Sequence, residues 1–102
     1  MEVLEYEWED GIRPFKQWFD SLSFGHALKI RTAVARMKNG NFSNVKSVGN
    51  GVSERRIDFG PGYKIYFAND GDNLIILLGG GTKKHQQSDI NKAKKCRKDY
   101  KN

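Results

Sequence analysis

The chain has 102 residues, 18 of them lysine or arginine and 12 aspartate or glutamate, for a formal net charge of +6. A chain of this length buries about 65% of its unfolded surface, so we expect one domain over residues 1–102. The longest aliphatic run, residues 74–78, falls far short of the roughly 20 residues of a membrane span. The first ten residues lack the apolar segment of a secretory signal, and a single cysteine excludes a disulfide framework. These features predict a cytoplasmic protein.

The charge is unevenly distributed along the chain. Five acidic residues lie within the first ten positions, so residues 11–102 carry 18 basic against seven acidic side chains, a net charge of +11. Residues 83–102 alone contain eight basic side chains and two acidic ones. This density suits a polyanionic partner, either nucleic acid or an acidic protein, and it is equally typical of a solvated helix face.

The first half of the chain predicts a strand and two helices. Alternation with glutamates favours a short strand in which the even positions are buried, Leu4, Tyr6 and Trp8. Asp10 is a candidate helix cap, and Pro14 suits a first helical turn. Apolar residues then recur at i, i+3, i+4 and i+7 or similar spacing in two segments: Phe15, Trp18, Phe19, Leu22 and Ala27, Ile30, Val34, Met37. This spacing predicts a helical hairpin with a buried aromatic stripe.

The second half of the chain predicts short strands and a last helix. Four segments rich in β-branched and aromatic residues, VKSV, SERRIDF, YKIYFA and NLIILL, are separated by GNG, GPG and NDGD. Residues 86–100 have a thin apolar stripe at helical spacing within a basic surround. Together the elements predict an α+β fold, in which an N-terminal helical hairpin packs on a mainly antiparallel twisted sheet and a basic helix ends the chain.

The strand pairing of SERRIDFGPGYKIYFA follows from its apolar pattern. Keeping both apolar sets on one face sets Phe59 opposite Tyr63, Ile57 opposite Ile65 and Arg55 opposite Phe67 around a bulged turn. The other face then carries a polar set, Glu54, Arg56, Asp58, Lys64 and Tyr66, with Arg56 opposite Tyr66 and Asp58 opposite Lys64. That face is either a wet surface with cross-strand charge pairs or a phosphodiester site.

Three consecutive glycines, residues 79–81, follow the run LIILL and precede Lys83, Lys84 and His85. A phosphate-binding loop needs two glycines five positions apart before Lys and Ser or Thr, so this spacing argues against one. The glycines form either a flexible strand exit with solvated lysines or an opening for a bulky polyanion. In the second case they would bring Lys83, Lys84 and His85 to the rim of the polar face.

At these residues the sequence resembles the RelE/ParE superfamily of toxins from bacterial type II toxin-antitoxin modules, in particular the addiction module killer protein branch related to HigB. That branch shows an E-L-R-I strand, a G-P-G-Y-R-I-Y-F hairpin and an ending of G-G-D-K-S-S-Q, D-I and A. This chain has ERRI, GPGYKIYF and GGTKKHQQSDINKA in the same order, so the resemblance covers nearly the whole chain. The chain departs from this pattern at four places. Arg55 replaces an aliphatic residue, Lys64 replaces an arginine and Thr82 replaces an acidic residue. Lys84 and His85 replace small polar residues.

The resemblance implies a RelE-like fold and the activity of the RelE and HigB members, which cut messenger RNA at the ribosome without a metal or other cofactor. The chain would then be a toxin and mRNA interferase that inhibits translation and growth. Its expected partners are a small helix-turn-helix antitoxin, mRNA and the ribosome, and no membrane.

The expected reaction is attack of a ribose 2′-OH on its own phosphate, which requires alignment, charge neutralisation and two proton transfers. The candidates are Arg56 and Lys83 for oxyanion stabilisation, Lys64 for backbone binding, Tyr66 for stacking or proton transfer, and His85 as general acid or base. Four further lysines are candidates for RNA binding: Lys84, Lys92, Lys95 and Lys98. Two alternatives stay open. ParE members poison DNA gyrase, and such a protein would keep the fold but would not need this set of residues. A noncatalytic nucleic-acid-binding domain would need only the basic tail.

Overall fold

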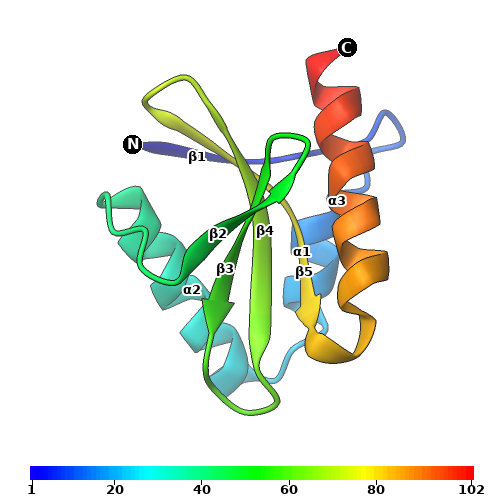
Figure 1. Cartoon of the computed structure of the whole chain (residues 1–102). Coiled ribbons are helices and arrows are strands. Elements are labelled where there is room, and N and C mark those ends of the chain that lie inside the picture. The colour runs from blue at the N-terminus through cyan, green and yellow to red at the C-terminus, as the bar shows by residue number, and fades with distance from the viewer.

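A computed structural model describes all 102 residues as a five-stranded sheet with helices on both faces (Figure 1). In chain order the elements are β1 (Glu2–Glu5), α1 (Pro14–Asp20), α2 (Phe24–Lys38), β2 (Val45–Gly49), β3 (Val52–Ile57), β4 (Tyr63–Asp70), β5 (Leu74–Thr82), a 3-10 turn η1 (Lys83–His85) and α3 (Gln86–Lys101). The α+β class and the C-terminal helix agree with the expectation from sequence. A strand precedes the two N-terminal helices, so the helices do not open the fold.

The strand order is β1-β5-β4-β3-β2. Three neighbouring pairs are antiparallel, whereas β1 pairs parallel with β5, so the sheet is mixed but mainly antiparallel. The chain between β1 and β5 runs through α1, α2 and the strands β2 to β4, and this long connection makes the parallel pairing possible, because parallel neighbours need a crossover. The N-terminal strand lies at the edge of the sheet beside β5.

Two apolar clusters lie on opposite faces of the sheet. In Figure 1, α2 lies on one side and α3 on the other. The cluster under α1 and α2 contains Phe15, Ile30, Ala33, Met37, Tyr63, Ile65, Phe67, Ile75 and Leu77. The cluster under α3 contains Tyr6, Val52, Tyr66, Ala68, Ile76, Leu78, Ile90, Ala93 and Cys96. The buried helical stripe expected from the apolar spacing is confirmed at Phe15, Ile30 and Met37. None of the helices has the length and apolar character needed to cross a bilayer.

The N-terminal strand is shorter than its alternating pattern suggests. Tyr6 is buried and Trp8 packs on the α3-side cluster, as expected for the even positions. Leu4, however, is 46% exposed, so its predicted burial is wrong. Leu4 belongs to neither apolar cluster.

The first helix begins later than the candidate cap. Its first residue is Pro14, as expected, but the residue before it is Arg13 and not Asp10. The Asp10 carboxylate accepts a hydrogen bond from the backbone N–H of Ile12 at 3.0 Å. Asp10 therefore closes a turn ahead of the helix, which is the local bond that short acidic side chains favour.

The β3–β4 pairing differs from the predicted register by two residues. Arg55 lies opposite Ile65, Arg56 opposite Lys64 and Ile57 opposite Tyr63. A shift of two preserves which residues share a face, so the division into two faces was predicted correctly although the partners were wrong. The cause is Phe59, which leaves the strand and packs against His26 with ring centroids 4.9 Å apart.

The three glycines lie inside β5 and not in a loop. A Cβ at Gly80 would collide with the indole of Trp18 in α1, and one at Gly81 would collide with the carboxylate of Asp89 in α3. The glycines therefore let helices approach closely from both sides of the same strand. Neither a flexible exit nor a free opening is present at Gly80 and Gly81.

Candidate functional site

The candidate site lies where β3 and β5 end and β4 begins. Arg56 is the register partner of Lys64, and Lys64 is in turn the partner of Gly81 in β5. Thr82 closes β5, and the turn Lys83–His85 follows at once. The sheet therefore brings the predicted residues Arg56, Lys64 and Lys83–His85 to one end, with Tyr66 two pairs further into the sheet.

The rim of this site is formed by exposed cationic residues. Arg56, Lys83, Lys84 and His85 are all exposed. The Nε atom of Arg56 lies 3.1 Å from Oδ1 of Asp58, and the two side chains are 54% and 70% exposed. An ion pair this exposed contributes at most about 1 kcal/mol, so an anionic ligand can displace Asp58.

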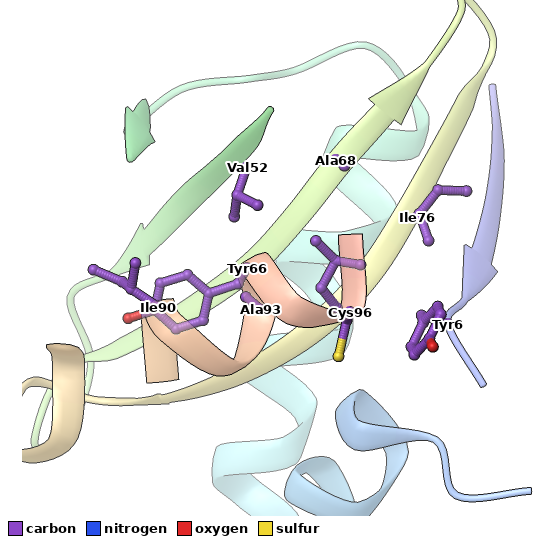
Figure 2. Close-up of a cluster of buried hydrophobic side chains, with 9 residues drawn as sticks. Tyr6, Val52, Tyr66, Ala68, Ile76, Ile90, Ala93 and Cys96 are labelled. Carbon is purple, nitrogen blue, oxygen red and sulfur yellow. The ribbon is translucent and has the colours of Figure 1, made fainter. Parts of the chain in front are cut away.

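The floor of the site is buried beneath α3. Tyr66 and Glu54 are 0% and 1% exposed, and Figure 2 shows the Tyr66 ring under α3 beside Ile90. The Lys64 Nζ atom donates to Oε2 of Glu54 at 2.7 Å, with the Lys64 side chain only 14% exposed. The Tyr66 ring offers no surface for a stacked base while α3 stays in place. Of the roles predicted for Tyr66, only proton transfer or hydrogen bonding through its hydroxyl fits this arrangement.

Two buried oxygen atoms in the floor have no hydrogen-bond partner, the Tyr66 hydroxyl and Oε1 of Glu54. Burial raises the pKa of Tyr66, and the negative charges of Glu54 and Asp89 raise it further. The hydroxyl thus stays protonated at neutral pH and can donate a hydrogen bond but cannot act as a base. Native structures contain few buried polar groups without partners, and such groups often mark functional sites.

Asp89 completes the floor, and the sequence analysis assigned it no role. It lies in the first turn of α3, with its carboxylate against Gly81. Burial raises its pKa, against the lowering effects of Lys92 and His85. A signal for Asp89 was present in the sequence, because it precedes Ile90 on the apolar stripe and belongs to the D-I motif. Glu54 was assigned to the correct face, but its burial was not foreseen.

The basic face of α3 lies outside the floor. Lys92, Lys95 and Lys98 are exposed, as RNA binding would require, and that role stays a prediction. A hollow of about 440 Å3 lies between α3 and the β2–β3 turn, and its charged lining is entirely basic: Lys94, Lys95, Arg97, Lys98 and Lys101. Cys96 is buried on the opposite side of the helix, where burial and the charge of Asp99 raise its pKa to about 11.

A larger hollow, of about 770 Å3, lies elsewhere, between β1, α1 and α2. Most of its charged residues pair with one another, Arg13 with Glu5 and Glu7, and Lys16 with Asp20, and the remaining one, Arg31, lies over the ring of Phe19. None of the buried side-chain atoms without a hydrogen-bond partner lies in this lining, so we place the candidate site at the end of β3, β4 and β5. Nowhere do three or more His, Cys, Asp or Glu side chains come together as metal ligands would.

No family model matches the chain. A protein of Haemophilus influenzae described as an uncharacterized protein is 43% identical over 81 residues, which make up 78% of this chain and 82% of the relative. The chain belongs to the family of this Haemophilus influenzae protein. The relative is itself uncharacterized, so the chemistry of this family member has to be inferred from the site alone.

In this member of the family, the site can bind an anion and transfer protons. Arg56, Lys83 and Lys84 supply exposed positive charge, and His85 adds an exposed imidazole, a side chain that can carry a proton. Beneath them, the Lys64–Glu54 pair and the Tyr66 hydroxyl form a fixed polar floor. A phosphodiester is the type of anion that matches several cations along an extended rim.

Proposed function

We propose that the protein is a RelE-like toxin of a type II toxin-antitoxin module, a cytoplasmic mRNA endoribonuclease that acts at the ribosome. The observation that carries the proposal is the convergence of Arg56, Lys83, Lys84 and His85 at the end of the sheet, above a buried floor with an unpartnered hydroxyl. The resemblance of the same strands to the RelE/ParE superfamily supports it.

The proposed reaction is an intramolecular transesterification of RNA. The ribose 2′-oxygen forms a bond to phosphorus and loses its proton, while the bond from phosphorus to the 5′-oxygen breaks and that oxygen gains a proton. The products are a 2′,3′-cyclic phosphate and a 5′-hydroxyl end. Arg56 and Lys83 donate hydrogen bonds to the nonbridging oxygens, whose charge grows in the transition state, and His85 transfers a proton.

We propose different tasks for the remaining predicted residues. The Lys64 Nζ atom lies 2.7 Å from Oε2 of Glu54. Lys64 therefore acts as a fixed positive charge beneath the RNA backbone and not as a mobile group. The Tyr66 hydroxyl can donate a hydrogen bond only to an atom that reaches the floor. Lys84, Lys92, Lys95 and Lys98 are exposed and extend the positive surface from the rim along α3, where an RNA strand can follow them.

An acidic antitoxin of the helix-turn-helix type is the expected protein partner. The net charge of +11 over residues 11–102 attracts polyanions without selectivity, and a partner that covers the rim would suppress this. The partner should protect Arg56 and Lys83 from chemical modification in the complex. Equal modification of both residues in the free and bound protein would contradict this arrangement.

A gyrase poison of the ParE type is the second candidate. It is favoured by the burial of Tyr66 and the engagement of Lys64 with Glu54, which leave fewer free groups for chemistry than the sequence pattern suggests. Such a protein would keep the fold and would not need the cationic rim. Purified protein should therefore be compared in two assays, cleavage of mRNA on ribosomes and supercoiling by DNA gyrase.

The decisive variant is Arg56→Ala. Loss of an oxyanion donor should slow cleavage by roughly 10²- to 10³-fold, while stability changes by less than about 1 kcal/mol because the side chain is exposed. Arg31→Ala, which removes an exposed arginine of α2 away from the rim, is the matched control and should keep the parental rate. The RNA ends should be analysed for a 2′,3′-cyclic phosphate, with and without chelator.

Two results would overturn this mechanism. They are parental cleavage by folded Arg56→Ala, and no cleavage together with gyrase inhibition by the parental protein. The last result would identify the second candidate.

A further inference from the structure

A small hollow lies on the α2 side of the sheet, on the face opposite Tyr66. It measures about 280 Å3 and lies between α2, β3 and the residues that flank β3. Its charged lining consists of four cations and one anion: Lys29, Arg36, Arg55, Arg56 and Asp58. A hollow of this size is smaller than typical small-molecule pockets of roughly 300 to 1,000 Å3, so it suits one compact group.

Arg55 is the buried member of this set. It is 4% exposed and lies between Val45 and Ile65 in the strand register. Its Nη1 atom donates to the backbone oxygen of Asn41 at 3.0 Å, but its Nε atom has no partner. Burial lowers the pKa of Arg55, and the nearby charge of Arg36 lowers it further. A buried charge without a counter-ion destabilises a fold, so Arg55 needs an explanation beyond packing.

The charges around the hollow do not balance. Asp58, the only acid, pairs with Arg56. Lys29 lies over the ring of Phe59, 5.0 Å from its centroid, and Arg36 is exposed in the last turn of α2. Lys29, Arg36 and Arg55 take part in none of the ion pairs of the structure. Three cationic side chains from two elements therefore line one small hollow without a counter-charge.

We propose that this hollow binds a dianionic phosphate group, held by Arg55, Arg36 and Lys29. Three cations match the double charge of a phosphate monoester or of inorganic phosphate better than the single charge of a carboxylate. The two guanidinium groups can donate paired hydrogen bonds to neighbouring phosphate oxygens. The hollow shares Arg56 with the candidate site. The proposal does not depend on RNA cleavage, because Arg55, Arg36 and Lys29 have no role in the proposed cleavage and the test measures binding alone.

The test is thermal unfolding at pH 8 with about 20 mM inorganic phosphate, against chloride and the dicarboxylate succinate at matched ionic strength. A ligand that binds only the folded state raises the melting temperature, so phosphate should raise it and succinate should not. The rise should vanish in Arg55→Met. It should persist in Lys46→Gln, which removes one exposed charge of β2 outside the hollow.

Arg36→Gln and Lys29→Gln keep the test informative if Arg55→Met does not fold, because both residues are exposed. Each should weaken phosphate binding roughly tenfold to a hundredfold in calorimetric titration, the range for loss of a charge-assisted hydrogen bond. The site is refuted if phosphate gives no rise beyond chloride, if succinate acts equally, or if the rise survives in both glutamine variants. It is also refuted if Arg55→Met lowers the melting temperature equally in phosphate and chloride, since Arg55 would then only hold the Asn41 carbonyl.

A last comparison identifies the source of the phosphate. A trinucleotide with a 5′-phosphate and the same trinucleotide with a 5′-hydroxyl should be titrated against the parental protein and Arg36→Gln. Stronger, Arg36-dependent binding of the phosphorylated form would assign the hollow to a nucleotide end. Equal binding of the two, together with Arg36-dependent binding of inorganic phosphate, would assign it to the free ion, and both results support a phosphate site.

Discussion

The two faces of the sheet differ in the kind of side chain that they bury. Under α1 and α2 the buried side chains are almost entirely apolar, with Arg55 as the exception. Under α3 the apolar cluster is interrupted by buried polar groups, including the Lys64–Glu54 pair and the hydroxyl of Tyr66. Hydroxyl–carboxylate bonds flank this face as well, between Tyr6 and Asp99 and between Tyr100 and Asp70.

The two faces therefore differ in what their buried side chains require. An apolar layer needs only volume and shape, whereas each buried polar group must find a partner or destabilise the fold. On the α3 face, Tyr66 and Glu54 each leave a buried oxygen without a hydrogen-bond partner, next to the cationic rim, and this lowers the stability of the fold. We therefore expect substitutions on the α2 face, apart from those in the cationic hollow around Arg55, to act through packing, and those on the α3 face to act through charge and hydrogen bonding.

The largest stability effect is expected on the apolar face. Met37 is fully buried in α2, so Met37→Ala should lower the free energy of unfolding by about 2 to 5 kcal/mol. Leu28→Ala in the same helix is the control, because Leu28 is 44% exposed and its truncation should cost less than about 0.5 kcal/mol. Urea unfolding measures both. Similar losses for the two variants would mean that α2 does not pack through its Met37 face.

The next largest effect on stability is expected from the buried charge pair on the α3 face. Lys64→Met leaves Glu54 buried without its partner and should cost about 3 kcal/mol at pH 7. Adding Glu54→Gln removes the stranded charge, so the double variant should recover at least about 1 kcal/mol of that loss. The same urea experiment tests the pair. A double variant no more stable than Lys64→Met would show that packing, and not charge, dominates here as well.

A smaller effect tests the close approach of α3 to β5. Gly81→Ala should cost about 1 to 3 kcal/mol, because the new methyl group meets the Asp89 carboxylate. In an Asp89→Ala background the same change should cost less than about 0.5 kcal/mol. Gly25→Ala, at a helical position with open space around it, is the control and should be neutral or slightly stabilising. Additive costs for Gly81→Ala and Asp89→Ala would place α3 further from the sheet.

The smallest effect appears only at alkaline pH. Burial and the charge of Asp99 raise the pKa of Cys96 to about 11, so the folded state favours the protonated thiol. This stability is complete below about pH 9 and falls by about 1.4 kcal/mol per pH unit from there to pH 11. Unfolded tyrosine begins to ionise in the same interval, so the contribution of the thiol from pH 9 to 10 is the difference between the parental protein and a Cys96 variant. In Cys96→Ala, the free energy of unfolding measured with urea should fall less steeply between pH 9 and 10. An unchanged slope would contradict the assignment.

Local patterns were sufficient for the elements and not for their contacts. The apolar spacing of Phe15, Ile30 and Met37 identified the buried helix face because helical periodicity is a local property. The register failed because Phe59 packs on His26, a residue more than 30 positions away. The glycines of β5 were misread for a similar reason, since what requires them is Trp18 and Asp89.

The candidate site was predictable to a similar extent. Arg56, Lys64 and Lys83 could be expected at one end because adjacent strands share that edge. Their exposure could not be predicted, because it depends on where α3 lies. A thin apolar stripe at Ile90 and Ala93 indicates that α3 packs somewhere, but it does not reveal that Tyr66 and Glu54 lie beneath it.

The parallel pairing of β1 with β5 has a consequence for how the chain is made. Glu2 pairs with Leu74 and Glu5 with Leu77, so β1 is synthesised well before its partner strand β5. At about 5 to 20 residues per second, the segment through α2 leaves the ribosome several seconds before β5 can cover it. The aromatic face of α1 is without its strand partner during that time, because its contacts are with β5. Contacts this distant in sequence also slow folding, so newly made chains should depend on chaperones until β5 is inserted between β1 and β4.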